Sequence, residues 1–223
     1  MPKQLVIFDW DGTLMDSTGR IVACMKAAAS DLALPELSDQ AVQQIIGLGL
    51  PQAIITLYPE LGEADAENMR SRYAAHFIEA ESEPNKLFDG VATLLARLRD
   101  QDRLLAVATG KSRKGLERVW GNTGYGEWFH ASRCADESFS KPHPHMVQSL
   151  LTEFSVEPDA AVVVGDTTHD LLMAANAGVD AIGVSWGAHD REQLASASPL
   201  ALTDRIEELS ALLTESLQEK ADV

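Results

Sequence analysis

A run of apolar residues near the N-terminus ends abruptly in two aspartates, one residue apart, in the segment LVIFDWDGTLMDS at positions 5–17. Residues 6–8 contain no polar side chain, which is typical of a strand that is buried on both faces of a parallel sheet. Asp9 and Asp11 would then lie at the rim of a hydrophobic core, where an unpaired charge is costly. The segment therefore predicts a buried strand that leads into a charged site.

Short apolar runs recur along the chain and alternate with amphipathic helical patterns. The runs lie at 4–9, 103–109, 161–165 and 181–185, with a weaker one at 129–133. Strands that alternate with helices are typical of α/β proteins with a parallel sheet. We therefore expect a doubly wound parallel sheet as the core of the fold.

One long interval interrupts the alternation. Helical patterns at 18–33, 39–46, 51–57 and 64–81 follow one another without a convincing strand. Proline and glycine turn signals separate them. We expect a small all-helical domain at 17–84, inserted above the strand end that carries the two aspartates, and an α/β core formed by 1–16 and 85–223.

Other helix boundaries also have recognisable signals. Ser112 is a candidate N-cap, and Gly178 suits the left-handed position after a helix. Residues 204–220 form an amphipathic pattern, which we expect to be a helix packed on the core. Cys24 lies on the apolar face of the first helical pattern and is expected to be a small core residue.

Composition narrows the possible partners. The formal net charge of −16 over 223 residues argues against binding to nucleic acid, because phosphate backbones require a basic surface. No apolar run approaches the length of a membrane span, and the N-terminus resembles a strand rather than a signal peptide. We expect a cytoplasmic protein that binds neither nucleic acid nor membranes. An anionic substrate would need local positive charge.

Polar side chains gather at the expected strand ends, where open parallel sheets bind their ligands. Asp9 and Asp11 follow the first strand, VATGK carries Thr109 and Gly110, and SFSKPHP carries Lys141. The segment VVVGDTTHDLLMAANAG adds Asp166 and Asp170. The candidate site residues are therefore Asp9, Asp11, Thr109, Gly110, Lys141, Asp166 and Asp170.

Four carboxylates in one crevice require a neutralising cation. Mg²⁺ favours oxygen ligands from one or two carboxylates together with substrate phosphate, so Mg²⁺ is the expected cofactor and a phosphate ester the expected substrate. The candidate ligands are Asp9, Asp11, Asp166 and Asp170. The metal would relieve the repulsion and supply positive charge in an acidic protein.

The spacing of these residues also points to chemistry. Asp9 and Asp11, at i and i+2, can face the same side of a strand end, so one can attack phosphorus while the other handles a proton. Thr109 and the Gly110 amide can hold a phosphoryl oxygen, and Lys141 can neutralise charge that develops during transfer.

In order, DWDGT with LMDS, VATGK, SKPHP and GDTTHD resemble the four signature motifs of the haloacid dehalogenase superfamily, and the helical insertion resembles its type I cap. The chain most resembles phosphoglycolate phosphatase-like enzymes of that superfamily. The resemblance implies that Asp9 is the nucleophile and a Mg²⁺ ligand, and that Asp11 is the proton donor and supplies a backbone carbonyl to the metal. It further implies phosphoryl binding by Thr109 and Lys141 and metal ligation by Asp166, with Asp170 either binding the metal directly or orienting it through water.

Alternative functions remain open. A β-phosphoglucomutase-like phosphotransferase would need a basic residue in the cap turn, but IIGLGLPQAI presents Leu48 and Leu50 there. A dehalogenase would have no use for Asp11. A receiver-like phosphoryl switch keeps its acceptor on a later strand and has no cap.

The identity of the ester is not determined by the motifs. The GLGL turn indicates a partly apolar pocket. Arg20 either meets a carboxylate or hydroxyl of the leaving group or is a solvated helix residue. Phosphoglycolate, a sugar phosphate, a nucleotide and pyrophosphate all fit the motifs. His169 lies near the expected site, whereas His143 and His145 are expected at the surface.

Overall fold

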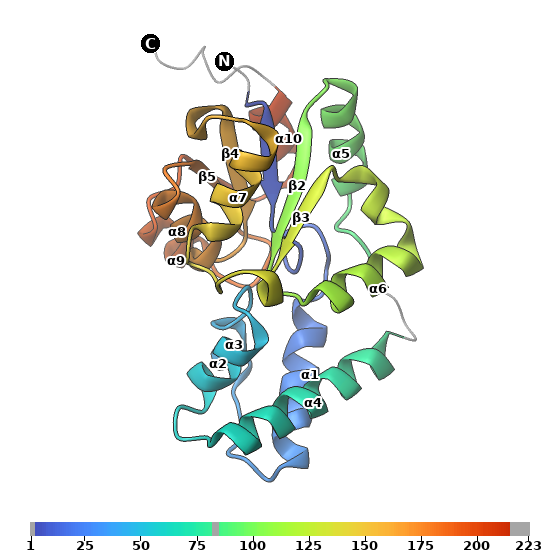
Figure 1. Ribbon diagram of the computed structural model, residues 1–223, viewed down its shortest axis with the longest axis vertical. Coiled ribbons are helices and arrows are strands. Elements are labelled where there is room, and N and C mark those ends of the chain that lie inside the picture. The colour runs from blue at the N-terminus through green and yellow to red at the C-terminus, as the bar shows by residue number, and fades with distance from the viewer. Residues whose placement is uncertain (1–2, 82–84, 215–223) are drawn as a thin grey trace.

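The computed structural model describes residues 3–81 and 85–214, which form a sheet with helices on both faces and a helical region at one end (Figure 1). Six parallel strands lie in the order β3-β2-β1-β4-β5-β6. Their bounds are Leu5–Phe8 (β1), Leu104–Thr109 (β2), Ala131–Cys134 (β3), Ala161–Gly165 (β4), Asp180–Val184 (β5) and Ala201–Thr203 (β6). The doubly wound parallel sheet predicted from the sequence is confirmed.

Side chains of β1 alternate between two hydrophobic cores. Val6 and Phe8 belong to one cluster, and Leu5 and Ile7 belong to the other. The first cluster is covered by α5 (Val91–Asp100), α6 (Arg113–Thr123) and α10 (Ile206–Thr214). The second is covered by α7 (His145–Phe154), α8 (Thr168–Asn176) and α9 (Arg191–Ser196). Burial on both faces explains why the central strands contain almost no polar residues.

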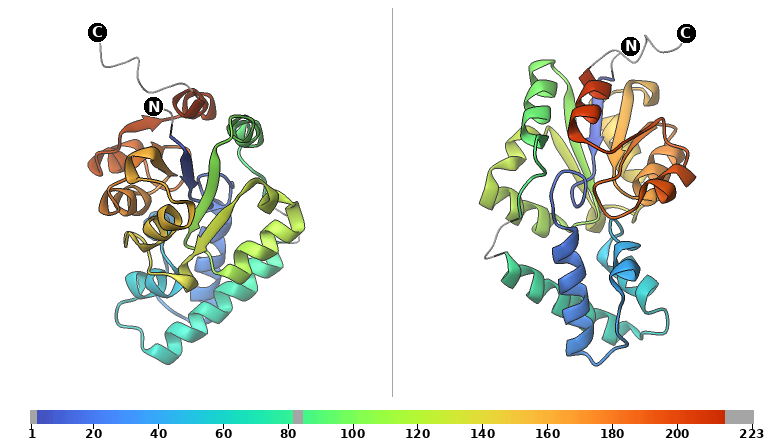
Figure 2. Two further views of the ribbon diagram at one scale, coloured as in Figure 1. Left: turned by 45° about the horizontal axis from the view of Figure 1, so that its top comes forward. Right: turned by 180° about the vertical axis from the view of Figure 1, so that it is seen from behind.

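Four helices between β1 and β2 form the cap, as expected. They are α1 (Thr18–Asp31), α2 (Asp39–Gln43), α3 (Leu50–Leu57) and α4 (Glu63–Ala80), and they share a third hydrophobic cluster. The views in Figures 1 and 2 place them beyond the carboxyl ends of the strands. The division of the chain at 16/17 and 84/85 stays a prediction, and residue 84 lies outside the described residues.

Local signals account for several helix ends. The Ser112 hydroxyl accepts a hydrogen bond from the Gly115 amide at the start of α6. Gly178 follows α8 with φ of 73°, in the left-handed region that favours glycine. The part of the chain that the structure describes also has three short 3₁₀ helices, at Tyr125–Trp128 (η1), Ala135–Glu137 (η2) and Pro158–Ala160 (η3). Among the helices of the described residues, none combines the length and apolar character that a membrane span requires.

The C-terminal part of the chain differs from the prediction in detail. Strand β6 and helix α9 are short elements that the sequence patterns do not predict. Within the expected helix at 204–220, the structure has α10, which buries Leu209 and Leu213 against the first core cluster. Residues 215–220 of the expected helix lie outside the described residues.

Candidate active site

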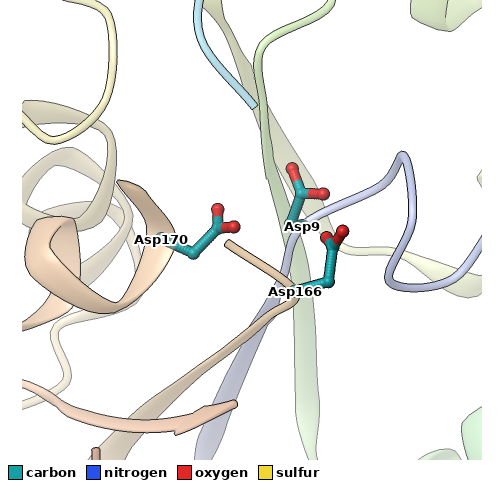
Figure 3. A group of neighbouring side chains, drawn as sticks. All are labelled: Asp9, Asp166 and Asp170. Atoms are coloured by element: carbon teal, nitrogen blue, oxygen red, sulfur yellow. The ribbon is translucent and has the colours of Figure 1, made fainter. Parts of the chain in front are cut away.

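Three buried carboxylates meet where β1 and β4 end. Asp9 directly follows β1, Asp166 directly follows β4, and Asp170 lies in the first turn of α8. Each residue is at most 2% exposed, and one carboxylate oxygen from each lies within 4.8 Å of the others. Figure 3 shows the three side chains turned toward a common space. Such proximity inside a core requires a compensating positive charge.

Lys141 supplies part of this charge from the loop before α7. Its Nζ lies 2.5 Å from Asp9 Oδ1 and 2.6 Å from Asp170 Oδ1, and the lysine side chain has no exposed surface. Burial by itself would lower the pKa of Lys141, but the two carboxylates raise it above its ordinary value. Lys141 therefore stays charged and bridges two of the three acids.

The start of α8 positions Asp170. Its Oδ2 accepts hydrogen bonds from Thr167 Oγ1 at 2.6 Å and from the Thr167 amide at 3.2 Å. These contacts form part of a capping box. Because Asp170 Oδ1 contacts Lys141, this residue both caps a helix and contributes charge to the cluster.

The turn after β1 and the loop after β5 both contact the carboxylate of Asp166. Thr13 Oγ1 donates a hydrogen bond to Asp166 Oδ1, and the Ala188 amide donates one to Oδ2, both at 2.7 Å. A Cβ atom on Gly12 or Gly187 would lie 2.2 Å or 2.1 Å from Asp166 Oδ2. The close approach of two backbone segments thus requires glycine at both positions, and nothing in the sequence pattern indicates this for Gly187.

The carboxylates disfavour one another's ionisation. Burial raises the pKa of Asp9 well above its ordinary value, with Lys141 opposing the rise and the charges of Asp170 and Asp166 adding to it. Burial, together with the charge of Asp170, raises the pKa of Asp166 to about 7. The negative charge of the cluster therefore exceeds what Lys141 compensates.

The donor set fits a divalent cation. Of the carboxylate oxygens of this cluster, only Asp9 Oδ2 lacks a hydrogen-bond partner within residues 3–81 and 85–214, although it is buried. All candidate metal ligands in this cluster are carboxylate oxygens, and hard divalent cations prefer oxygen ligands. A bound cation would satisfy Asp9 Oδ2 and offset the surplus charge.

Asp11 lies in the same cavity as Asp9, and its carboxylate has different partners. Asp11 Oδ1 accepts a hydrogen bond from Ser17 Oγ at 2.6 Å and lies 3.1 Å from Lys111 Nζ. The Lys111 ammonium also lies over the Phe77 ring of the cap, 4.5 Å from its centroid. Lys111 is a site residue that is absent from the candidates predicted from the sequence, although its position beside Thr109 and Gly110 is a signal that could have found it.

Thr109 and Gly110 lie at the end of β2, directly beneath the cap. Thr109 is fully buried, and its hydroxyl accepts a hydrogen bond from the Lys111 amide at 3.1 Å. A Cβ atom on Gly110 would lie 2.5 Å from the Leu48 carbonyl oxygen and 2.7 Å from that of Gly47. The cap turn therefore rests on the backbone of Gly110.

Two further contacts join the cap to the core. The Gly49 amide donates a hydrogen bond to Ser140 Oγ at 3.0 Å, and His169 Nε2 lies 2.9 Å from the Gln44 carbonyl oxygen. Next to these contacts lies a cavity of about 450 Å³, with Asp9 and Asp11 in its wall. The cap thus covers the carboxylate site and encloses space beside it.

Other residues singled out in the sequence take different places. Arg20 lines a separate cavity of about 30 Å³ next to Asp11, rather than the large one. His143 and His145 pack around the Phe139 ring. Cys24 is buried in the cap cluster, which confirms the expectation of a core residue.

Comparison with known proteins relates this arrangement to a family. Residues 6–184 match the model of the haloacid dehalogenase-like hydrolases. The chain belongs to this family. The matched range includes all seven candidate site residues, from Asp9 to Asp170, so the expected superfamily is confirmed.

Individual relatives of this hydrolase cover nearly its full length. The protein named "Probable phosphatase IndB" from Dickeya dadantii is 38% identical over 212 residues, which is 93% of this chain and 92% of that protein. A phosphoglycolate phosphatase from Vibrio cholerae is 27% identical over 91% of this chain and 93% of its own. The crystal structure of a predicted phosphatase from Clostridium acetobutylicum superposes with a TM-score of 0.86 at 23% identity, covering 97% of this chain and 100% of that one, which shows a shared fold.

Proposed function

We propose that this hydrolase is a Mg²⁺-dependent phosphatase that cleaves a small phosphomonoester through an aspartyl-phosphate on Asp9. The observation that carries the proposal is the unpaired state of Asp9 Oδ2, a buried carboxylate oxygen that makes no hydrogen bond with the described residues. Asp9 also lines the large cavity and contacts the charged Lys141. The phosphatase names of the relatives from D. dadantii and V. cholerae support the same reaction class.

The reaction would proceed in two halves. In the first, a carboxylate oxygen of Asp9 attacks phosphorus, the ester P–O bond breaks, and Asp11 gives its proton to the departing oxygen. In the second, Asp11 takes a proton from water as the water oxygen attacks phosphorus. The bond between Asp9 and phosphorus then breaks, which releases inorganic phosphate and restores the carboxylate.

The remaining site residues would hold the phosphoryl group and the metal. Thr109, the Gly110 amide and Lys141 would contact phosphoryl oxygens. The carboxylates of Asp9, Asp166 and Asp170 and the backbone carbonyl of Asp11 would hold Mg²⁺. When bound, the ion supplies positive charge that stabilises the phosphoryl oxygens. Lys111 would hold the carboxylate of Asp11 in place, since the two groups are 3.1 Å apart.

The cap turn supports hydrolysis over mutase chemistry. Leu48 and Leu50 line the large cavity at this turn, where a mutase would need a cation for a second phosphate. The turn also covers Gly110 and thereby limits the access of water during transfer.

Metal removal tests the proposal directly. We expect the protein to release inorganic phosphate from phosphomonoesters in Mg²⁺, to lose this activity in a chelator, and to regain it when excess Mg²⁺ is restored, because the carboxylate cluster needs a further positive charge. Phosphate release from a panel of esters measures the effect. Turnover that is indifferent to the chelator would contradict the metal assignment.

Gly110→Ala tests whether the cap turn must rest on β2. We expect kcat/KM to fall by about tenfold or more, because the new Cβ would meet backbone carbonyls of the cap turn that cannot yield as a flexible side chain would. Gly121→Ala is a matched control, since no atom of the described residues lies within 4 Å of a Cβ at Gly121. Parent-like kcat/KM in Gly110→Ala would show that this contact is dispensable.

A further inference from the structure

We infer that the natural ester has a leaving group with a sizeable apolar body, rather than a short carboxylic acid. This inference rests on the proposed phosphatase activity and names the substrate class of the same site. It follows from the size, the lining and the charges of the cavity under the cap.

The cavity is too large for a small acid. Its volume of about 450 Å³ lies in the range of sites that enclose whole small molecules. Liquid water occupies about 30 Å³ per molecule, so the space corresponds to about fifteen waters. A two-carbon leaving group attached to a phosphoryl group at Asp9 would leave most of this volume filled with water.

Apolar side chains from α1, from the segment that leads into and begins α3, and from α4 form much of the cavity wall. They are Met25, Ile46, Leu48, Leu50, Phe77 and Ile78. The rings of Phe77 and its neighbour Tyr73, which also lines the cavity, lie 5.7 Å apart at 37°. Ile78 is 51% exposed, and a substrate body would cover apolar surface here at a gain in binding free energy.

Most cations of the wall are already paired within the chain, which disfavours a carboxylate on the leaving group. Lys111, Arg118 and Arg70 are each paired with a carboxylate of the chain itself. Lys114 makes no ion pair with the described residues, but its side chain is exposed at the start of α6. An anionic group next to the carboxylate site would have to compete with the largely buried pair of Lys111 and Asp11.

A homologous series tests the inference on the parent enzyme. Ethyl, butyl and hexyl phosphate have leaving groups of nearly equal acidity, so differences in kcat/KM report contacts of the alkyl chain. We expect about a fourfold gain per methylene, on the order of a hundredfold or more from ethyl to hexyl, and phosphoglycolate to be a poorer substrate than hexyl phosphate.

The outcomes separate the inference from the activity on which it rests. A flat alkyl series, or a preference for phosphoglycolate, with Mg²⁺-dependent release intact would overturn the inference and leave the phosphatase standing. Absence of release from every ester would overturn both.

A pair of cap variants locates the effect. Leu50 and Ile55 both belong to α3, but Leu50 lines the cavity, whereas Ile55 is 52% exposed and does not. We expect Leu50→Asn to reduce the ratio of kcat/KM for hexyl over ethyl phosphate by about tenfold, and Ile55→Asn to leave the ratio unchanged. Equal ratios in the parent and both variants would show that the wall at Leu50 does not contact the alkyl chain, which overturns the inference drawn from the lining of this cavity.

Discussion

Asp9→Asn should abolish phosphate release and at the same time raise the thermal stability of the metal-free protein. An amide cannot replace the attacking carboxylate, so we expect kcat to fall by on the order of 10⁴-fold or more. Phosphate release in Mg²⁺ measures this loss. Activity within a few-fold of the parent would show that Asp9 is not the nucleophile.

The gain in stability follows from the raised pKa of Asp9. The folded protein holds the Asp9 proton more tightly than the unfolded chain does, so this group stabilises the fold at low pH and loses that contribution as the pH rises toward its folded pKa. Above that pH, ionised Asp9 destabilises the parent. An asparagine carries no charge, so the variant should have the higher Tm at pH 8 in a chelator.

Thermal unfolding at pH 8 and pH 5 tests this second effect. The difference in Tm between variant and parent should shrink at pH 5, where the parent is closer to its protonated state. Asp16→Asn is a matched control, because Asp16 is an exposed aspartate of the same segment. Lost activity combined with a lower Tm at pH 8 would indicate a collapsed site rather than a missing nucleophile.

Lys141→Met should strongly destabilise the protein. The substitution leaves Asp9, Asp166 and Asp170 buried within 4.8 Å without their lysine. Removal of one partner from a buried ion pair typically costs about 3–5 kcal/mol, which corresponds to a decrease in Tm of roughly 10 °C for a chain of this size. We also expect activity to be lost, because the charge beside the phosphoryl group is gone.

The pH dependence distinguishes this mechanism from a simple packing defect. Without Lys141, which opposes the rise, the pKa of Asp9 lies higher still, so the folded state binds protons more tightly than the unfolded one and stability recovers as the pH falls through the raised pKa. Added Mg²⁺ should restore part of the Tm. Lys26→Met is the control, since Lys26 pairs with Asp39 at an exposed position and its loss should leave the Tm unchanged. Parent-like stability of Lys141→Met at pH 8 would contradict the compensating role.

Much of the fold follows from local patterns. A strand buried on both faces needs an unbroken apolar run, and residues 5–8 provide one whose side chains fill both cores. Trp10, which lies between the two aspartates in the sequence, is buried against Trp120 and Phe129. Asp9, Asp166 and Asp170 were also predictable, since they belong to the family motifs. Each follows a strand or begins a helix at the edge of the sheet where ligands bind.

Elements without a local pattern were not predictable in this way. Strand β6 has only three residues, too few to show a period, and it forms because β5 offers an open edge. The groups that contact the Asp166 carboxylate come from a turn near residue 12 and from a loop near residue 187. Neither segment carries a signal of the other.

The amino-acid sequence by itself determined which side chains stand at the strand ends, since hydrophobic periodicity and turn residues act over a few neighbouring positions. Only the tertiary structure decided how those side chains pair. Lys141 reaches Asp9 across 132 positions, and Lys111 pairs with Asp11, because the order of the strands places their carboxyl ends side by side. The cavity under the cap is likewise a property of packing, since its wall comes from helices and loops far apart in the chain.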